Sequence, residues 1–267
     1  LIAFLSGVDC AIIGLEQINE YVLRALPRLK VISKYGVGID ALDIRAMKRH
    51  GVSLGWTPGV NKRSVSELVI AQMVNALRFL PESNQDIKTG KWEIRKSHQL
   101  STRVVGIIGL GHVGQDLASL LSVFGCRIVA HDIANRNKVA ARENIELMSL
   151  EKLLSEADIV TLHTPLNETT KEFINRQKLE LMKPNAILIN YARGALVDQS
   201  ALTEMLALEK LGGAVFDVFD QEPPEDLALI NQPRFFCSAH IGGSSFEAIV
   251  AMGMAAIDGL EKFYLQH

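Results

Sequence analysis

Short apolar runs alternate with longer segments of helical periodicity along most of the chain. We predict strands within Cys10–Gly14, Leu29–Ser33, Val52–Gly55, Val104–Gly109, Arg127–Asp132, Asp158–His163, Ala186–Asn190, Gly213–Val218 and Phe235–His240. Helical spacing or capping residues mark Ile44–His50, Ser64–Phe79, His112–Phe124, Leu150–Ser155 and Ser200–Leu211, the last of which follows Asp198 as a predicted N-cap. This alternation predicts an α/β fold with a parallel sheet. The polar segment Glu82–Leu100 suggests a domain seam.

Length, composition and charge narrow the class of protein. The chain has 267 residues, 48% of them apolar, which is enough for one large or two modest domains with sizeable cores. A formal net charge of −2 without blocks of like charge disfavours a nucleic-acid partner. No stretch approaches the roughly 18 apolar residues of a membrane helix, and the first apolar stretch contains Asp9 and lacks a positive leader. We therefore predict a cytoplasmic globular protein.

The cysteines agree with a reducing compartment. Cys10, Cys126 and Cys237 are an odd, widely spaced set within apolar runs. This pattern argues against a disulfide framework and against a cysteine metal knuckle. We predict three small buried apolar side chains and no metal site.

A glycine-rich turn indicates a dinucleotide. A predicted strand is followed by Gly109-x-Gly111-x-x-Gly114, a helix, and a second strand that ends in Asp132. In such a unit the glycines allow a tight turn, close approach of a pyrophosphate, and helix-strand packing, while the acidic residue accepts from the ribose hydroxyls. A carboxylate there repels a 2′-phosphate and favours NAD over NADP, although Arg136 lies close enough in sequence to soften that preference.

Three polar residues follow three consecutive predicted strands. They are Arg193, Glu222 and His240. Taken singly, each has an ordinary structural interpretation, as a solvated loop arginine, a turn before two prolines, and a packed histidine. Their shared position at the carboxyl ends of buried strands, where open α/β sheets bind ligands, favours a common functional site.

At this point the chain resembles the D-isomer-specific 2-hydroxyacid dehydrogenase family. The matching blocks are VVGIIGLGHVG, LHTPLNETT, LMKPNAILINYARGALVD, GAVFDVFDQEPP and AHIGGSS, and the likeness extends from about Val31 to the C-terminus. It implies an NAD-dependent oxidoreductase that interconverts a 2-oxo acid and a D-2-hydroxy acid. His240 would act as acid and base, Glu222 would orient its imidazole and favour the protonated form, and Arg193 would bind the substrate carboxylate and carbonyl.

The resemblance also assigns binding residues. The implied cofactor contacts are Gly109, Gly111, His112, Val113, Gly114, Asp132, His163, Thr164, Pro165, Ala192, Asp217 and Gly242, of which Asp217 would meet the nicotinamide carboxamide. The implied substrate contacts are Tyr35, Gly36, Val37, Gly38 and Asn61, with backbone N–H groups of the glycine loop facing the carboxylate. For His163, a packing role at a strand end is an equal alternative.

The architecture implied by the resemblance has two α/β domains. A Rossmann-type NAD-binding domain would span 63–241, and a smaller flavodoxin-like substrate domain would combine 1–62 with 242–267, including a C-terminal helix at Ser245–Leu265. Family members usually carry a further strand-helix-strand-helix segment before the point matched by Leu1, so an N-terminal truncation is expected. The helix from Val65 to Leu80 and the arm through Trp92 would form the interface of a homodimer, with a core helix as the alternative for the former.

Two departures and one rival function remain open. Phosphoglycerate-specific relatives place an arginine where this chain has Gly14-Leu15-Glu16, which weakens the case for a phosphorylated substrate. The catalytic partner is a glutamate rather than the glutamine of formate-oxidising relatives, which argues against formate. The alternative function is a non-catalytic NAD-binding dimeric scaffold, such as a corepressor-like protein of the same fold.

Overall fold

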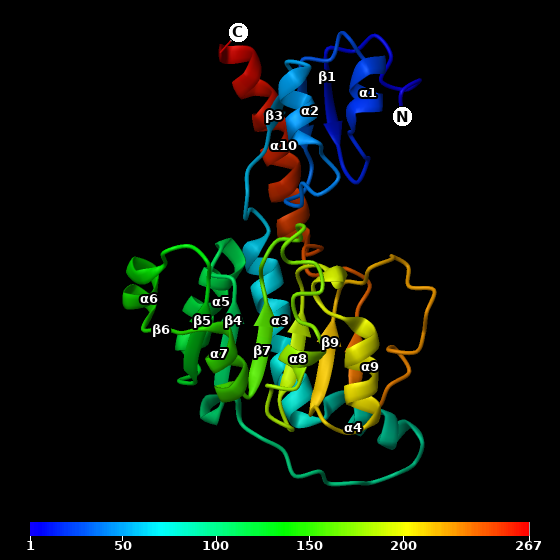
Figure 1. Ribbon diagram of the computed structural model, residues 1–267. Helices are drawn as coiled ribbons and strands as arrows, with labels where there is room; N and C mark the ends of the chain where they lie inside the picture. Colours follow the sequence, from blue (N-terminus) through cyan, green and yellow to red (C-terminus); the bar gives the residue numbers. More distant parts are fainter. Residues whose placement is uncertain (267) are drawn as a thin grey trace. The chain divides into compact units, whose positions relative to one another are not determined.

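The chain divides into two compact units, each described here by itself. The computed structural model describes residues 1–266 (Figure 1). The smaller unit combines Leu1–Ser64 with the chain from Gly243 onward, and the larger unit is Val65–Gly242. The polar segment Glu82–Leu100 lies inside the larger unit, so the seam suggested there is wrong. By Glu82 the preceding helix has already buried its apolar face in that unit.

The larger unit is built on a parallel sheet with strand order β10-β9-β8-β7-β4-β5-β6 (Figure 1). Its strands are β4 (Val104–Ile108), β5 (Arg127–His131), β6 (Glu146–Leu147), β7 (Ile159–Leu162), β8 (Ile187–Asn190), β9 (Gly213–Phe216) and β10 (Phe235–Cys237). Every residue of β7, β8 and β9 is buried, because helices cover both faces. The strand order reverses between β4 and β7, which is where doubly wound sheets bind ligands.

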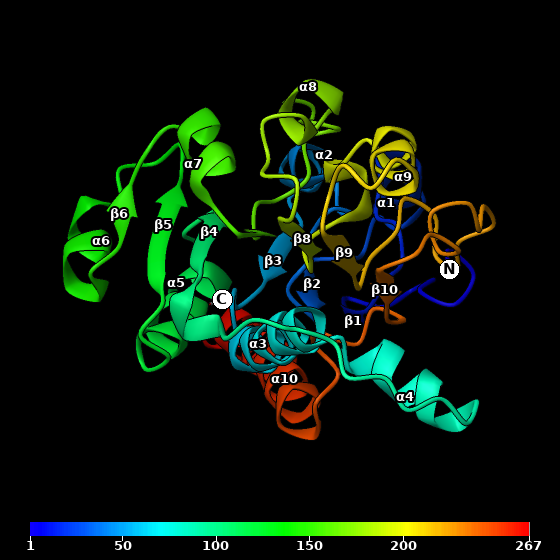
Figure 2. The same ribbon diagram turned by 90° about the horizontal axis from the view of Figure 1, so that it is seen from below.

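Two helical layers enclose this sheet (Figure 2). One face packs against α7 (Leu150–Glu156), α8 (Arg176–Leu179) and α9 (Gln199–Ala207), and the other packs against α3 (Lys62–Arg78), α5 (His112–Ser122) and α6 (Asn137–Glu143). Helix α4 (Leu80–Lys88) contains no buried residue and leads away from the sheet. Short 3-10 helices lie at Leu100–Thr102 and Gly194–Leu196.

The smaller unit is a three-stranded parallel sheet covered on both faces. Its strands β1 (Cys10–Ile13), β2 (Val31–Lys34) and β3 (Ser53–Gly55) lie in that order. One face packs on α1 (Glu20–Ala25) and α2 (Ile44–Arg49), and α10 (Phe246–Gln266) packs on β2 and β3. A Cβ at Gly259 of α10 would lie 2.3 Å from the Ser33 Oγ and 2.9 Å from the Gly55 Cα, so glycine is required for this close contact.

The parallel α/β fold predicted from the sequence is confirmed, with local corrections. Asp198 caps α9 as predicted, since its carboxylate accepts from Ala201 N–H at 2.9 Å. Helix α9 ends at Ala207 rather than Leu211, because Glu209 adopts a left-handed conformation with φ of 52°. The sequence patterns missed α1, α4, α6, α8 and β6. Helix α4 buries none of its residues and so lacks an apolar face to detect, and α8 and β6 have only four and two residues.

Two burial predictions need correction. Cys126 is buried, but Cys10 is partly exposed and Cys237 is exposed, because they lie on β1 and β10, which are edge strands. All three cysteines are free. In α3, Val69 and Met73 are fully buried in the core of their own unit. The core-helix alternative is therefore confirmed for that apolar face, which gives no support to an interface.

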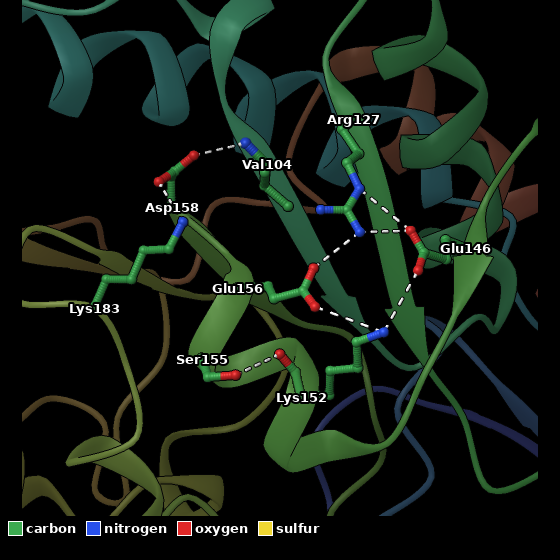
Figure 3. A network of polar contacts seen from close by, with 8 residues as sticks. All are labelled: Val104, Arg127, Glu146, Lys152, Ser155, Glu156, Asp158 and Lys183. Atoms are coloured by element: carbon green, nitrogen blue, oxygen red, sulfur yellow. Dashed lines mark hydrogen bonds and ion pairs between the residues drawn. The ribbon is translucent and has the colours of Figure 1, made fainter.

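Charged side chains lie along the edge of the larger sheet at which its strands begin (Figure 3). The guanidinium of Arg127, at the start of β5, lies 2.5 Å from a carboxylate oxygen of Glu146 and 2.9 Å from one of Glu156. Lys152 bridges the same two carboxylates at 3.8 and 3.6 Å. These side chains are largely exposed, so the ion pairs add little stability individually.

Asp158 makes the more buried contact at this edge. Its carboxylate accepts from Val104 N–H at 2.8 Å and from Lys183 Nζ at 3.0 Å, which joins the starts of β4 and β7 (Figure 3). Burial by itself raises the pKa of Asp158, but these hydrogen bonds outweigh it and the pKa lies below its usual value. The stabilisation is therefore fully present above the unfolded-state pKa, and it is lost as the pH falls through the folded-state value.

We expect Asp158→Asn to lower the melting temperature at pH 7 by about 2–4 °C, which corresponds to ~1 kcal/mol in a protein of this size. Below about pH 4, the ordinary range of an aspartate pKa, the parent loses this contribution as the carboxylate is protonated, and the melting temperatures of the two proteins should converge. Differential scanning calorimetry at several pH values measures both. A constant difference across that range would mean that the charge of Asp158 is not the source of the stabilisation.

Candidate active site

The turn between β4 and α5 has three glycines with three different surroundings. Gly109 has a φ of 99°, and a Cβ there would lie 2.5 Å from the His163 carbonyl oxygen. At Gly114 a Cβ would lie 2.1 Å from the Gly109 carbonyl oxygen. No heavy atom lies within 4 Å of a Cβ placed at Gly111. Gly109 and Gly114 are thus fixed by packing, while Gly111 leaves space at the N-terminus of α5, as a bound pyrophosphate requires.

Asp132 lies just beyond β5 and is tied to this turn. One carboxylate oxygen accepts from Leu110 N–H at 2.8 Å and from Arg136 Nε at 3.1 Å, and the other accepts from Ala134 N–H at 2.7 Å. Burial raises the pKa of Asp132, but the hydrogen bonds from Ala134, Leu110 and Arg136 bring it below its usual value. The group is therefore an anion at neutral pH. Arg136 pairs with Asp132 itself, and its contact with a 2′-phosphate stays a prediction.

Arg193 follows β8 in a turn shaped by a buried amide. The Asn190 side chain is fully buried; it accepts from Ala192 N–H at 3.1 Å and donates to the Arg193 carbonyl at 2.8 Å. A Cβ at Gly194 would lie 2.1 Å from the Phe219 carbonyl carbon, so this turn packs directly against the segment that follows β9. The partly buried guanidinium donates to the Ala192 carbonyl at 2.6 Å through Nη1.

His240 and Glu222 form a direct pair. His240 Nδ1 lies 2.7 Å from Glu222 Oε2, and Glu222 Oε1 accepts from Phe219 N–H at 3.0 Å. The imidazole is half exposed, so its other nitrogen has access to solvent or to a ligand. Glu222 follows β9 and His240 follows β10, next to β8 and its Arg193. The structure therefore brings the three predicted catalytic residues to the same edge of the sheet.

The segment around His240 is held by Asp217. This carboxylate, directly after β9, is 2% exposed and accepts hydrogen bonds from Ser238, Ile241 N–H and Gly242 N–H. Ser238 was not among the residues singled out from the sequence. A serine two positions before a histidine carries no motif of its own, so its role became visible only from the contact with Asp217.

His163 lies in different surroundings from His240. It lies at the end of β7, beside the glycine-rich turn, and its Nε2 is 2.9 Å from the Thr161 hydroxyl. Burial lowers the pKa of His163 to about 3, so it is neutral throughout the physiological range. Thr164 and Pro165 continue the chain from this point. A neutral, buried imidazole can pack against a ligand, but it cannot supply a proton at neutral pH.

The predicted substrate residues lie in the smaller unit, at the carboxyl edge of its sheet. The loop Tyr35–Gly38 directly follows β2, and its carbonyl groups are held from two sides. Buried Lys34 donates from Nζ to the Gly14 and Tyr35 carbonyls at 2.6 and 2.8 Å. Trp56, after β3, donates to the Val37 carbonyl at 3.2 Å. Sequence reasoning missed Lys34 and Trp56, although a lysine at the end of a buried strand was a usable signal.

Asn61 is buried in the same unit. Its amide nitrogen would lie 2.6 Å from a Cβ at Gly243, and its Oδ1 has no hydrogen-bond partner among the described residues. An unsatisfied buried acceptor is costly and is commonly completed by water or a ligand. Asn61 therefore has an acceptor available for a hydroxyl or amide group.

Residues 1–266 contain neither a metal-binding cluster nor a helix that could span a membrane. No group of three histidine, cysteine or carboxylate side chains there could hold a metal ion. In the same part of the chain, no helix combines the length and the apolar character needed to cross a bilayer.

A doubly wound parallel sheet with this glycine-rich turn and with an acidic residue after the next strand defines a Rossmann-type dinucleotide-binding unit. Residues 70–242 match the family described as D-isomer specific 2-hydroxyacid dehydrogenase, NAD binding domain. The chain therefore belongs to that family, as its sequence motifs predicted, and residues 70–242 are its NAD-binding domain.

The chain is similar in sequence to dehydrogenases and reductases. It is 34% identical over 249 residues to a D-3-phosphoglycerate dehydrogenase of Methanocaldococcus jannaschii, which covers 92% of this chain and 48% of the relative. It is 32% identical over 268 residues to a hydroxypyruvate reductase of Thermotoga maritima, which covers 98% of this chain and 87% of the relative. The chain thus spans about half the length of the former and most of the latter.

Solved structures agree on the fold. An acyclic imino acid reductase in complex with NADPH and D-Arg aligns with a TM-score of 0.92 at 25% identity, over 99% of this chain and 85% of that chain.

Proposed function

We propose that the protein is an NAD-dependent oxidoreductase that interconverts a 2-oxo acid and a D-2-hydroxy acid. The observation that carries this proposal is the His240–Glu222 pair, which follows β10 and β9, together with Arg193, which follows the adjacent strand β8 at the same carboxyl edge of an NAD-binding domain. Such a site combines a proton donor with a cation for the substrate.

The cofactor site fits NAD. Gly111, with its open Cβ position, and the N-terminus of α5 would receive the pyrophosphate, and the carboxylate of Asp132 would accept from the adenosine ribose. His163, Thr164, Pro165, Ala192 and Gly242 follow strands at the same edge and would line the rest of the site. When bound, NADH supplies the hydride that reduces the substrate carbonyl.

His240 would give its proton to the oxygen of the carbonyl as that oxygen gains negative charge. Glu222 accepts from Nδ1, which leaves Nε2 as the atom that would face the substrate. In the oxidation of a 2-hydroxy acid, the neutral imidazole takes the proton back.

Arg193 would bind the substrate carboxylate and polarise its carbonyl. A guanidinium can donate two parallel hydrogen bonds to a planar anion, which fixes the orientation of the substrate as well as neutralising its charge. In the smaller unit, the N–H groups of Gly36–Gly38 are candidate donors to an anionic group, and the free acceptor of Asn61 is a candidate for a hydroxyl group.

The end of β1 disfavours a second anionic group on the substrate. Glu16 accepts from Gly14 N–H at 2.7 Å, which holds its carboxylate at the carboxyl edge of the small sheet. The cation nearby, Lys34, is already bound to backbone carbonyls. Short, uncharged side chains, as in glyoxylate or hydroxypyruvate, fit this environment better than a phosphate ester.

The decay of NADH fluorescence with glyoxylate, hydroxypyruvate, 3-phosphohydroxypyruvate and pyruvate tests the function. We expect turnover with at least one, and less with the phosphorylated compound than with hydroxypyruvate. If NADH binds but none of the four is reduced, the non-catalytic scaffold becomes the better explanation.

We expect NADH to bind more tightly than NADPH, because anionic Asp132 would meet the 2′-phosphate. Removing Arg136 (Arg136→Ala) should widen the preference, because its charge now offsets part of that of Asp132 at 3.1 Å. Asp132→Ala should favour NADPH by about tenfold or more, since a hydrogen bond to the ribose is lost and Arg136 is released for the phosphate. Fluorescence titration with both cofactors measures this. An unchanged ratio of dissociation constants in Asp132→Ala would remove Asp132 from the site.

Self-association is supported by the arm that follows α4. Trp92 is 85% exposed and Ile94 is 89% exposed, and Ile87 on α4 is also exposed. Exposed apolar side chains on an extended arm are typical of interfaces, and the simplest closed assembly is a two-fold dimer.

We expect a homodimer at micromolar concentration, measured by light scattering. The double variant Trp92→Glu and Ile94→Glu should give a folded monomer, whereas Ile133→Glu, a fully exposed residue outside this arm, should leave the dimer intact. A parent protein that is monomeric at this concentration would contradict the proposed assembly.

A further inference from the structure

The Asp217 side chain accepts three hydrogen bonds from one short segment. Its Oδ1 accepts from the Ser238 hydroxyl and from Ile241 N–H at 2.9 Å, and its Oδ2 accepts from Gly242 N–H at 2.7 Å. Its backbone carbonyl also accepts from His240 N–H at 2.9 Å. These four donors lie within Ser238–Gly242, the segment that carries the histidine.

His240 needs such support because its backbone is unusual. Its φ is 53°, in the left-handed region that residues other than glycine seldom adopt. A residue keeps this conformation only when its surroundings impose it. The bonds from Asp217 fix the backbone on both sides of His240, and so fix the direction in which its imidazole leaves the chain toward Glu222.

A second residue extends this support into the core. The Tyr191 hydroxyl lies 3.3 Å from the Ser238 hydroxyl. Ser238 has one proton and gives it to Asp217, so Tyr191 must be the donor in the contact with Ser238. Burial raises the pKa of Tyr191, which keeps this proton in place. Tyr191, Ser238 and Asp217 therefore form a directed chain from a buried ring to the anchoring carboxylate.

We propose that Asp217 is a positioning residue, which sets the conformation of Ser238–Gly242 and thereby presents His240 to Glu222 and the substrate. This inference rests on the proposed function and differs from a contact with the nicotinamide carboxamide. Three of the hydrogen bonds that this carboxylate accepts come from its own chain. At 2% exposure, Asp217 has its main role toward its own chain.

The Asp217→Asn variant separates the two roles. Asparagine keeps the shape of the aspartate side chain, but its NH₂ group faces the Gly242 N–H, or the Ile241 N–H if the amide is flipped. Two donors then face each other and one hydrogen bond is lost. We expect kcat for 2-oxo acid reduction to fall by about 10- to 100-fold, as when a general acid is misplaced, while the dissociation constant of NADH changes by less than about threefold. A carboxamide contact predicts the reverse, with weaker NADH binding and a nearly unchanged kcat, and that outcome would overturn the proposal.

Two further variants make the interpretation specific. Asp158→Asn is the matched control, because it removes the charge of another carboxylate that holds a backbone N–H, at the opposite edge of the sheet, and should leave kcat unchanged. Combining Asp217→Asn with Glu222→Gln should cost less than the product of the single losses, because both act through His240. Independent, multiplying effects would contradict the proposal.

Hydrogen exchange of the backbone amides tests the anchoring without any reaction. In Asp217→Asn, the peptide containing Ser238–Gly242 should exchange at least about tenfold faster, while β4 and β7 keep the protection of the parent. Ser238→Ala is a milder change that should give a smaller increase in the same peptide. It replaces Asp217→Asn in this experiment if that variant does not fold. Unchanged exchange in this peptide would contradict the proposal that Asp217 anchors the segment. If the parent protein is inactive but exchange is faster in the variants, only the proposed enzymatic function is contradicted.

Discussion

His240→Ala is expected to reduce the turnover of 2-oxo acids by on the order of 10²-fold or more at every pH, because it removes the proposed proton donor. Glu222→Gln keeps a hydrogen-bond acceptor 2.7 Å from the imidazole but removes the negative charge that favours the imidazolium. Its reduction rate should therefore start to decline at a lower pH than that of the parent. Steady-state rates over a range of pH, with NADH saturating, measure both effects.

The smaller unit supplies a matched control for this experiment. His50 Nε2 lies 2.8 Å from Glu20 Oε1, which is nearly the same pair of groups at nearly the same distance, on α1 and the end of α2. His50→Ala should leave kcat unchanged. If His240→Ala keeps most of the activity, or if the Glu222→Gln profile overlays that of the parent, the proton comes from another group.

The fold was predictable because its signals are local. The strand Ile187–Asn190 begins with three consecutive apolar residues, and all four of its residues are buried. The glycine spacing after β4 reflects packing within a few residues. The Asp198 cap belongs to the same kind of signal, since a side chain bonds an amide three positions away. Elements of few residues, such as α8 and β6, give too little periodicity to be detected.

The candidate site was only partly predictable, because much of its support comes from contacts across the sequence. Arg193, Glu222 and His240 share a position after predicted strands, so the pattern could group them. Asn190, which shapes the turn of Arg193, reads in the sequence as the last residue of a strand. Ser238 becomes meaningful only when Asp217, 21 positions earlier, is seen beside it.

The sequence pattern also could not decide whether an apolar residue lies in a central strand or in an exposed edge strand. Cys237 stands in an apolar run, and the same run would be buried in a central strand. It is exposed because β10 is the last strand of the sheet, and the order of strands is a property of the whole fold. The same reasoning explains why the apolar face of α3 was ambiguous: its length indicated burial, but not whether the partner was its own sheet or a second chain.

Arg193→Gln is expected to lower kcat/KM for 2-oxo acids by about 10²-fold or more, because it removes two charge-assisted hydrogen bonds to the substrate. KM should rise and kcat should fall together, since a carboxylate is bound in the ground state while the carbonyl gains charge in the transition state. The turn itself should survive, because Asn190 holds the backbone carbonyl of Arg193 rather than its side chain. NADH affinity should accordingly remain close to that of the parent.

Arg193→Lys and a surface arginine complete this test. Lysine keeps the charge but not the planar fork, so it should recover part of the KM effect and little of the kcat effect. Arg176, whose guanidinium lies 2.6 Å from a Glu204 carboxylate oxygen, is the matched control, and Arg176→Gln should leave both constants unchanged. Steady-state kinetics with glyoxylate and hydroxypyruvate, together with the binding of oxamate to the NADH complex, measure these effects. If Arg193→Gln binds oxamate as the parent does and loses only turnover, Arg193 acts on the reacting carbonyl and the substrate carboxylate is held by another group.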